Sequence, residues 1–62
     1  MRLEDGTKVV ATSEVGDVEY GEIGTVLWFM PGDDSCPYDL YTVDFPDMGY
    51  AVDMRPEDIE RA

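Results

Sequence analysis

The stretch GEIGTVLWF, residues 21–29, places two glycines directly before the most apolar run in the chain. That run, residues 25–30, is short, rich in β-branched and aromatic residues, and stops at Pro31, so it favours a strand over a buried helix. Glycine lacks a Cβ and is accepted at positive φ and where two backbones approach closely. The pattern predicts a central strand, covered on most sides and preceded by a sharp bend at Gly21 and Gly24. A phosphate-binding loop does not fit, because no lysine follows and no helix begins there.

Three other segments have the character of short strands. Residues 7–13 are rich in β-branched residues. Residues 40–45 alternate, with Tyr41, Val43 and Phe45 on one face and polar Thr42 and Asp44 on the other. Such a period of two is typical of a half-buried strand. Residues 50–54 alternate in the same way, which predicts that Tyr50, Val52 and Met54 point inward and Asp53 outward.

Turn-forming residues separate these segments. Residues 14–24 are predicted to form a glycine-rich acidic loop with a brief extended piece at residues 18–20. Residues 31–39 are predicted to form an exposed loop. Pro46 and Gly49 turn the chain between two strands. Residues 55–62 are expected to form one helical turn, with Pro56 at its first position and Ile59 covering an open end of the fold.

These segments predict one all-β domain spanning residues 1–62, built from four to five short antiparallel strands with a C-terminal helical turn. Sheets this short protect their edges by curling into a small barrel. The expected core is Val26, Val43, Phe45 and Val52. A chain this small has little material left for a deep catalytic pocket.

The charge is strongly acidic, with 15 Asp and Glu against 4 Lys and Arg, giving −11. Binding to DNA or RNA depends on cations that replace counterions at phosphates, so direct nucleic-acid binding and attraction to anionic membranes are not expected. The sign favours a protein partner with a basic surface, although acidity also serves solubility. No apolar run is long enough to span a bilayer and no signal-peptide core follows Met1, so we expect a cytoplasmic protein with a reduced Cys36.

The chain resembles the small SH3-like barrels, a group that includes KOW-type modules and uncharacterised bacterial and phage-borne families. The resemblance rests on the paired valines Val9 and Val10, on Gly-x-x-Gly-Thr-Val at residues 21–26, on Tyr-x-Val-x-Phe at residues 41–45, and on the terminal Pro-Glu-Asp-Ile-Glu at residues 56–60. It implies an SH3-like barrel and says little about activity. KOW-type modules contact RNA or ribosomal proteins, but this chain lacks the basic residues that such contacts need.

No catalytic, metal-binding or cofactor site is predicted. Histidine is absent, which removes histidine-based acid–base and nucleophilic chemistry. Asp33, Asp34, Ser35 and Asp39 could offer oxygen atoms to a hard cation, but their spacing differs from that of a calcium-binding EF-hand loop. We therefore predict no enzyme and no bound cofactor.

Partner binding is the best-supported class of function. SH3-like barrels present aromatic side chains between loops, and the candidates here are Tyr20, Tyr38 and Trp28, with Asp33 and Asp34 as acidic neighbours. Trp28 is also a candidate for the core, and Tyr20 for a cover over the barrel mouth. The chain is expected to be a monomer or a weak homodimer, since an uncovered edge strand could pair two copies.

An alternative is a nucleic-acid mimic, in one version phage-encoded, that inhibits a DNA- or RNA-binding protein. Alternate residues on a strand lie about 6.6 Å apart, close to the spacing of phosphates. The mimicry hypothesis requires carboxylates gathered on one face of the protein. The candidates for this face are Asp44, Asp53, Glu14, Asp17, Glu19 and Glu22.

Overall fold

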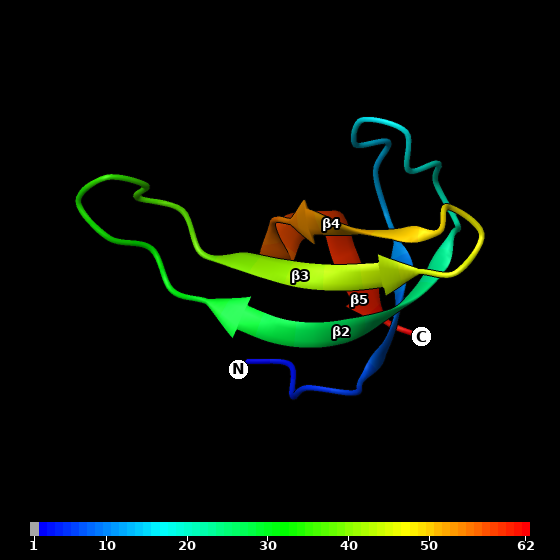
Figure 1. Cartoon of the computed structure of the whole chain (residues 1–62), viewed down its shortest axis with the longest axis horizontal. Coiled ribbons are helices and arrows are strands. Elements are labelled where there is room, and N and C mark those ends of the chain that lie inside the picture. The colour runs from blue at the N-terminus through cyan, green and yellow to red at the C-terminus, as the bar shows by residue number, and fades with distance from the viewer. Residues whose placement is uncertain (1) are drawn as a thin grey trace.

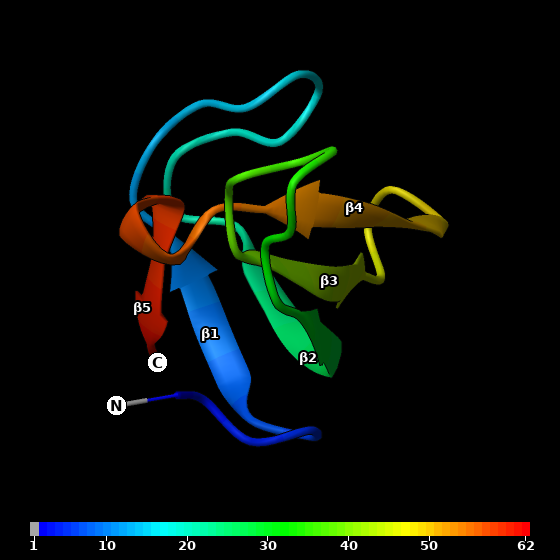
Figure 2. The ribbon, with the colours of Figure 1, turned by 90° about the vertical axis from the view of Figure 1, so that its left-hand side faces the viewer.

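A computed structural model describes residues 2–62 and consists of one five-stranded antiparallel sheet with a single short 3-10 turn (Figure 1). The elements are β1 (Lys8–Ala11), β2 (Ile23–Met30), β3 (Leu40–Phe45), β4 (Tyr50–Met54), η1 (Pro56–Asp58) and β5 (Ile59–Arg61). The strand order across the sheet is β4-β3-β2-β1-β5. Figure 2 shows β1 and β5 running at a steep angle to β3 and β4, so the sheet is strongly coiled. The predicted all-β antiparallel class is confirmed.

The boundaries of β3 and β4 match the prediction, whereas those of the other elements differ. The first strand covers residues 8–11 rather than 7–13, and β2 begins at Ile23, inside the segment predicted as loop. Backbone bonds from Ala11 N to Glu22 O (2.8 Å) and from Gly21 N to Ala11 O (2.8 Å) tie the two ends of the 12–22 loop together. The extended piece expected at residues 18–20 is instead a bridge between Val15 and Val18.

The C-terminal segment was predicted as one helical turn, and this is wrong for its second half. Only Pro56–Asp58 form a 3-10 turn, after which Ile59–Arg61 become β5 and pair with β1. A three-residue strand has no readable period, and its partner lies about 50 residues away in the sequence. Local pattern therefore could not reveal it.

The core lies on the concave side of the coiled sheet and contains the residues expected there. Val26, Val43 and Phe45 are buried, and Val52 packs against them from a partly buried position. Ile59 is buried as expected. The acidic 12–22 loop is anchored by a buried valine that the sequence did not indicate as core, Val18.

Gly21, which precedes β2, and Gly24, the second residue of β2, have the two structural roles predicted for them. Gly21 has a φ of 89°, a region that side chains rarely occupy. A Cβ on Gly24 would lie 2.6 Å from Val43 Cγ1 and 2.8 Å from the carbonyl oxygen of Asp44. Gly24 therefore allows β2 and β3 to approach at the point where the sheet bends.

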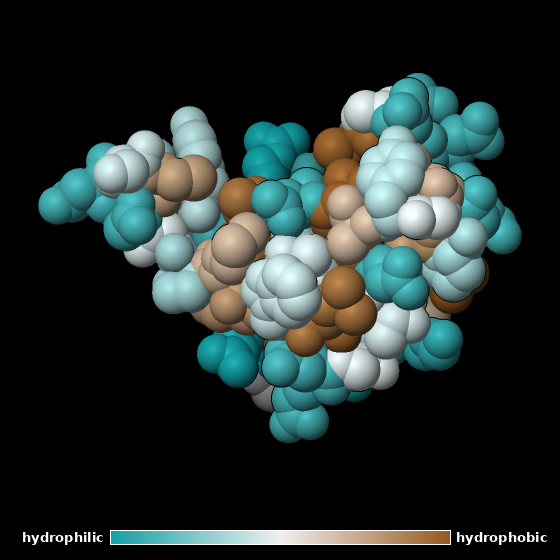
Figure 3. All heavy atoms as spheres, in the orientation of Figure 1, coloured by the Kyte–Doolittle hydropathy of each residue, from teal (hydrophilic) through white to brown (hydrophobic). Residues whose placement is uncertain are grey.

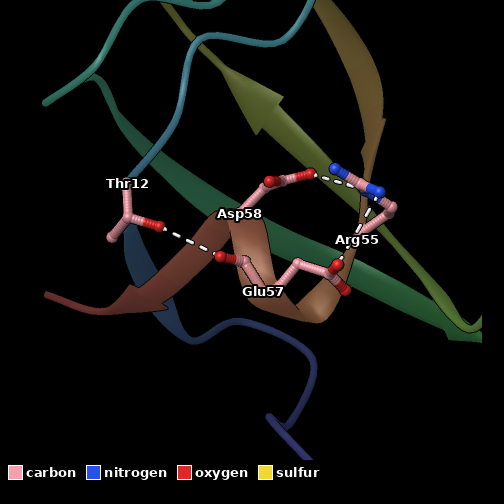
Figure 4. Close-up of polar contacts among 4 residues, drawn as sticks. All are labelled: Thr12, Arg55, Glu57 and Asp58. Atoms are coloured by element: carbon pink, nitrogen blue, oxygen red, sulfur yellow. Dashed lines mark hydrogen bonds and ion pairs between the residues drawn. The ribbon is translucent and has the colours of Figure 1, made fainter.

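A polar cluster holds η1 and β5 against the rest of the sheet (Figure 4). The carboxylate of Asp58, only 3% exposed, accepts a hydrogen bond from Arg55 Nε at 3.0 Å, and this contact raises the pKa of Arg55. Thr12 N donates to Asp58 O at 2.8 Å, and Thr12 Oγ1 to Glu57 O at 3.3 Å. The cluster joins the start of the 12–22 loop to the C-terminal turn.

Replacing Asp58 with asparagine is expected to lower the free energy of unfolding by about 1–2 kcal/mol, because a buried charge-assisted hydrogen bond is lost. The matched control is Glu57→Gln, since Glu57 contacts Arg55 at 3.6 Å with both side chains exposed and should matter little. Urea unfolding followed by circular dichroism measures both. Equal losses in the two variants would contradict a structural role for Asp58.

Candidate functional site

Among residues 2–62, no other element covers the convex face of β2, β3 and β4, and we call this face the outer face. The pairing register places on it Thr25 and Trp28 of β2, Thr42 and Asp44 of β3, and Ala51 and Asp53 of β4. Cross-strand rows follow from this register, one of them being Trp28–Thr42–Asp53. The inward residues Val26 and Val43 pair on the opposite side of the same strands.

An irregularity in β2 increases the apolar content of the outer face. The register with β3 shifts between Val26 and Trp28, so Leu27 is an extra residue in the strand. Bulges of this kind turn two successive residues toward one side, and both Leu27 and Trp28 are exposed, Trp28 by 51%. The prediction that this strand is covered on most sides is wrong for Leu27 and Trp28, because both side chains are exposed.

Carboxylates and hydroxyls border this apolar centre. Thr42 Oγ1 donates a hydrogen bond to Asp53 Oδ1 at 2.8 Å, which fixes the carboxylate beside β3. Thr42 was predicted as an exposed polar residue, but it is 5% exposed because its neighbours on the outer face cover it. In Figure 3 apolar residues gather in the middle of the face that carries β2 and β3, with hydrophilic residues around them.

A shallow depression of about 430 Å³ continues the outer face toward the β3–β4 turn. Its lining includes Tyr20, Ile23, Thr25, Pro46 and Asp47. Thr25 belongs both to this depression and to the outer face, and Lys8 Nζ donates to Thr25 Oγ1 at 3.1 Å. A smaller hollow of about 250 Å³, lined by Arg2, Phe29 and Tyr41 among others, lies apart from these residues.

The three predicted aromatic residues are all exposed, but they occupy different parts of the surface. Tyr20, 73% exposed, lines the depression beside the β3–β4 turn, and Trp28 lies on the outer face. Tyr38, 64% exposed, lies in the 31–39 loop, which extends from the opposite end of β2 and β3 (Figure 1). Tyr20 therefore lines a depression that adjoins the outer face at Thr25, and Trp28 lies on that face. Tyr38 lies away from both, in the 31–39 loop.

The predicted acidic residues of the 31–39 loop are occupied by local hydrogen bonds. Asp33 Oδ1 accepts from the backbone N–H groups of Ser35 and Cys36, at 2.9 and 2.8 Å, and Asp39 Oδ1 accepts from Gly32 N at 2.8 Å. Asp34 is exposed. Residues 2–62 contain no group of three or more histidine, cysteine, aspartate or glutamate side chains placed to hold a metal ion.

The prediction that Tyr50 of β4 points into the core is wrong. It was expected in the core, but it is half exposed, and its hydroxyl donates to Asp17 Oδ2 at 3.1 Å. Tyr50 is the first residue after the β3–β4 turn, so its ring extends beyond the core toward the 12–22 loop. The hydrogen bond to Asp17 raises the pKa of Tyr50 because it stabilises the protonated phenol.

Comparisons with protein-family models, with curated protein sequences and with solved structures each found no match for this chain. Within residues 2–62, no helix has the length and apolar character that crossing a membrane requires.

Proposed function

We propose that this chain is a non-catalytic SH3-like module that binds a protein partner through its outer face. The observation that carries the proposal is the half-exposed indole of Trp28 at the centre of an uncovered sheet face, with Leu27 beside it. Tryptophan is strongly enriched among the residues that dominate binding energy at protein interfaces. In a chain that needs its apolar residues for a small core, two adjacent exposed apolar residues on an uncovered sheet face favour a binding role.

The SH3-like assignment is supported by the architecture. Residues 2–62 form five short antiparallel strands in one strongly coiled sheet, with a 3-10 turn before the last strand and a long loop between β1 and β2. The last strand returns to pair with the first. Closure of this sheet into a barrel is part of the proposal.

The charge of the outer face indicates what kind of partner it fits. Asp44 and Asp53 lie on the same face as Trp28, and Glu22 and Asp47 line the adjoining depression. The one base among these lining residues is Lys8. A basic side chain of a partner could stack on the indole of Trp28 and pair with Asp53. We therefore propose a partner that presents lysine or arginine around an apolar contact.

Replacing Trp28 with alanine is expected to weaken partner binding by about 30-fold, equivalent to about 2 kcal/mol. The fold should be retained because the indole is half exposed. Proteins captured from a lysate at low salt would be identified by mass spectrometry, and the affinity of the captured partner would then be measured by calorimetry. Binding should weaken as salt is raised, because the contact is partly ionic.

The matched control is Tyr38→Ala, which removes an even more exposed aromatic residue from the 31–39 loop. It should leave binding within about twofold, since side chains outside the contact contribute little. If Tyr38→Ala abolishes binding and Trp28→Ala does not, the loop is the binding site and the outer face is not.

Nucleic-acid mimicry has less support than partner binding. Asp44 and Asp53 lie on the outer face, whereas the other four carboxylates considered belong to the 12–22 loop, where Asp17 bonds to Tyr50. The centre of the outer face is apolar rather than anionic. A partner that is displaced by DNA or RNA and is insensitive to Trp28→Ala would favour mimicry instead.

A further inference from the structure

The edge of β4 is a free strand edge. β4 is the terminal strand of the sheet and pairs only with β3. Within residues 2–62, no backbone hydrogen bond connects Tyr50–Met54 to a loop or to any strand other than β3, and no side chain bonds to their backbone. The N–H and C=O groups that point away from β3 are therefore available to another chain.

The sequence of β4 contains few of the features that block strand addition. Natural edge strands are protected by lysine, proline, bulges or short length. β4 has the sequence YAVDM, without lysine or proline, and it pairs with β3 through five consecutive residues without a register shift. Tyr50, Ala51 and Asp53 are exposed. The edge is thus regular over its whole length.

Two acidic loops flank this edge. Figure 3 shows them projecting on either side, with the surface notched between them above β4. The 12–22 loop carries four carboxylates and the 31–39 loop three, and neither contains lysine or arginine: Glu14, Asp17, Glu19 and Glu22 in the first, Asp33, Asp34 and Asp39 in the second. A chain placed along β4 would run between two anionic walls.

We propose that the β4 edge binds an extended, arginine- or lysine-rich segment of a protein partner, which adds to the sheet as a sixth strand. This proposal rests on the proposed function, which names a basic protein as the partner. It adds how that partner binds, namely as a strand along β4. Backbone hydrogen bonds supply the alignment, and the seven loop carboxylates supply charge complementarity. A second copy of this chain fits less well, since its own acidic loops would face the same walls.

The added strand would extend a row that already crosses the outer face. Neighbouring strands lie about 4.8 Å apart, so the residue next to Asp53 continues the row Trp28–Thr42–Asp53. A basic side chain at that position meets the Asp53 carboxylate directly. Strand addition and outer-face contact are therefore compatible in one partner.

The test uses a capped peptide of Arg-Val repeated four times and the ¹⁵N-labelled full chain. On titration, the amide signals of Tyr50–Met54 should shift, and hydrogen exchange should slow by at least tenfold at those amides of β4 that point away from β3. The same peptide with three consecutive central amides N-methylated keeps every charge and side chain but loses donors on both edges. It should bind at least tenfold more weakly.

Two protein variants with the same charge change compare the two sheet edges. Asp53→Lys on β4 should weaken binding by at least threefold more than Glu60→Lys on β5. Equal binding of the N-methylated peptide would overturn the proposal, as would an equal effect of the two variants. Shifts confined to Leu27 and Trp28 would overturn strand addition and leave the outer-face function standing. Dimerisation of the chain alone, with Tyr50–Met54 protected, would assign the edge to a second copy and overturn the proposal.

Discussion

Replacing Phe45 with alanine is expected to lower the free energy of unfolding by about 3–5 kcal/mol, the cost typical of removing a buried phenylalanine. Phe45 is fully buried at the end of β3. Chains of fewer than about 70–80 residues rarely have stabilities above about 3–5 kcal/mol, so the variant should be largely unfolded at room temperature. Urea titration followed by circular dichroism measures the loss.

The matched control for Phe45 is the residue directly opposite it in the sheet. Tyr50 pairs with Phe45 in the β3–β4 register but is half exposed. Tyr50→Ala removes a similar volume from the same row and should cost far less. A loss as large as that of Phe45→Ala would mean that the core does not lie where the structure places it.

The second large effect is expected at Gly24, where β2 and β3 approach. A Cβ there would overlap Val43 Cγ1 and the Asp44 carbonyl oxygen, at 2.6 and 2.8 Å. Overpacking of this kind costs about 1–3 kcal/mol, so Gly24→Ala should be clearly destabilised. Gly24→Val, which adds two more methyl groups, should prevent folding.

The control for Gly24 is Ala51→Val, which adds bulk at an exposed position of β4. Valine is favoured in strands, so its melting temperature should be unchanged or higher. Thermal unfolding of the three variants compares them. A Gly24→Ala variant as stable as the parent chain would show that β2 and β3 do not approach closely at this glycine.

The local fold could be predicted wherever one segment carries a clear period of its own. β3 has strict alternation, and Tyr41, Val43 and Phe45 are all buried as that alternation requires. The turn at Pro46 and Gly49 fixed the start of β4. The central strand was found from its apolar run, and the roles of Gly21 and Gly24 followed from glycine's lack of a Cβ.

Features that depend on distant residues could not be predicted. β5 has three residues and exists because it pairs with β1. Tyr50 has the right alternation for the core, yet its position at the strand end leaves it exposed and bonded to Asp17. Thr42 is polar and on the outer face, yet cross-strand neighbours bury it.

The candidate site was only partly visible in the sequence. Trp28 was named, but its exposure depends on the register shift next to Leu27, which no local pattern indicates. The one local hint was the apolar run at residues 26–30, which places apolar side chains on both faces of the strand and so on the outer face too. The free edge of β4 follows from the strand order, which is a property of the whole fold.

Collisional quenching of Trp28 fluorescence tests the central claim most directly, because Trp28 is the only tryptophan in the chain. The structure places the indole at the surface, on the same sheet face as Asp53 and Asp44, where a negative electrostatic field is expected. Red-shifted emission is expected. Relative to the quenching of free N-acetyltryptophanamide by the same ion, caesium should quench Trp28 more efficiently than iodide at low salt, and the difference should shrink as salt is added. Blue-shifted emission that neither ion quenches, or equal quenching by the two ions after this normalisation, would contradict an exposed and acidic outer face.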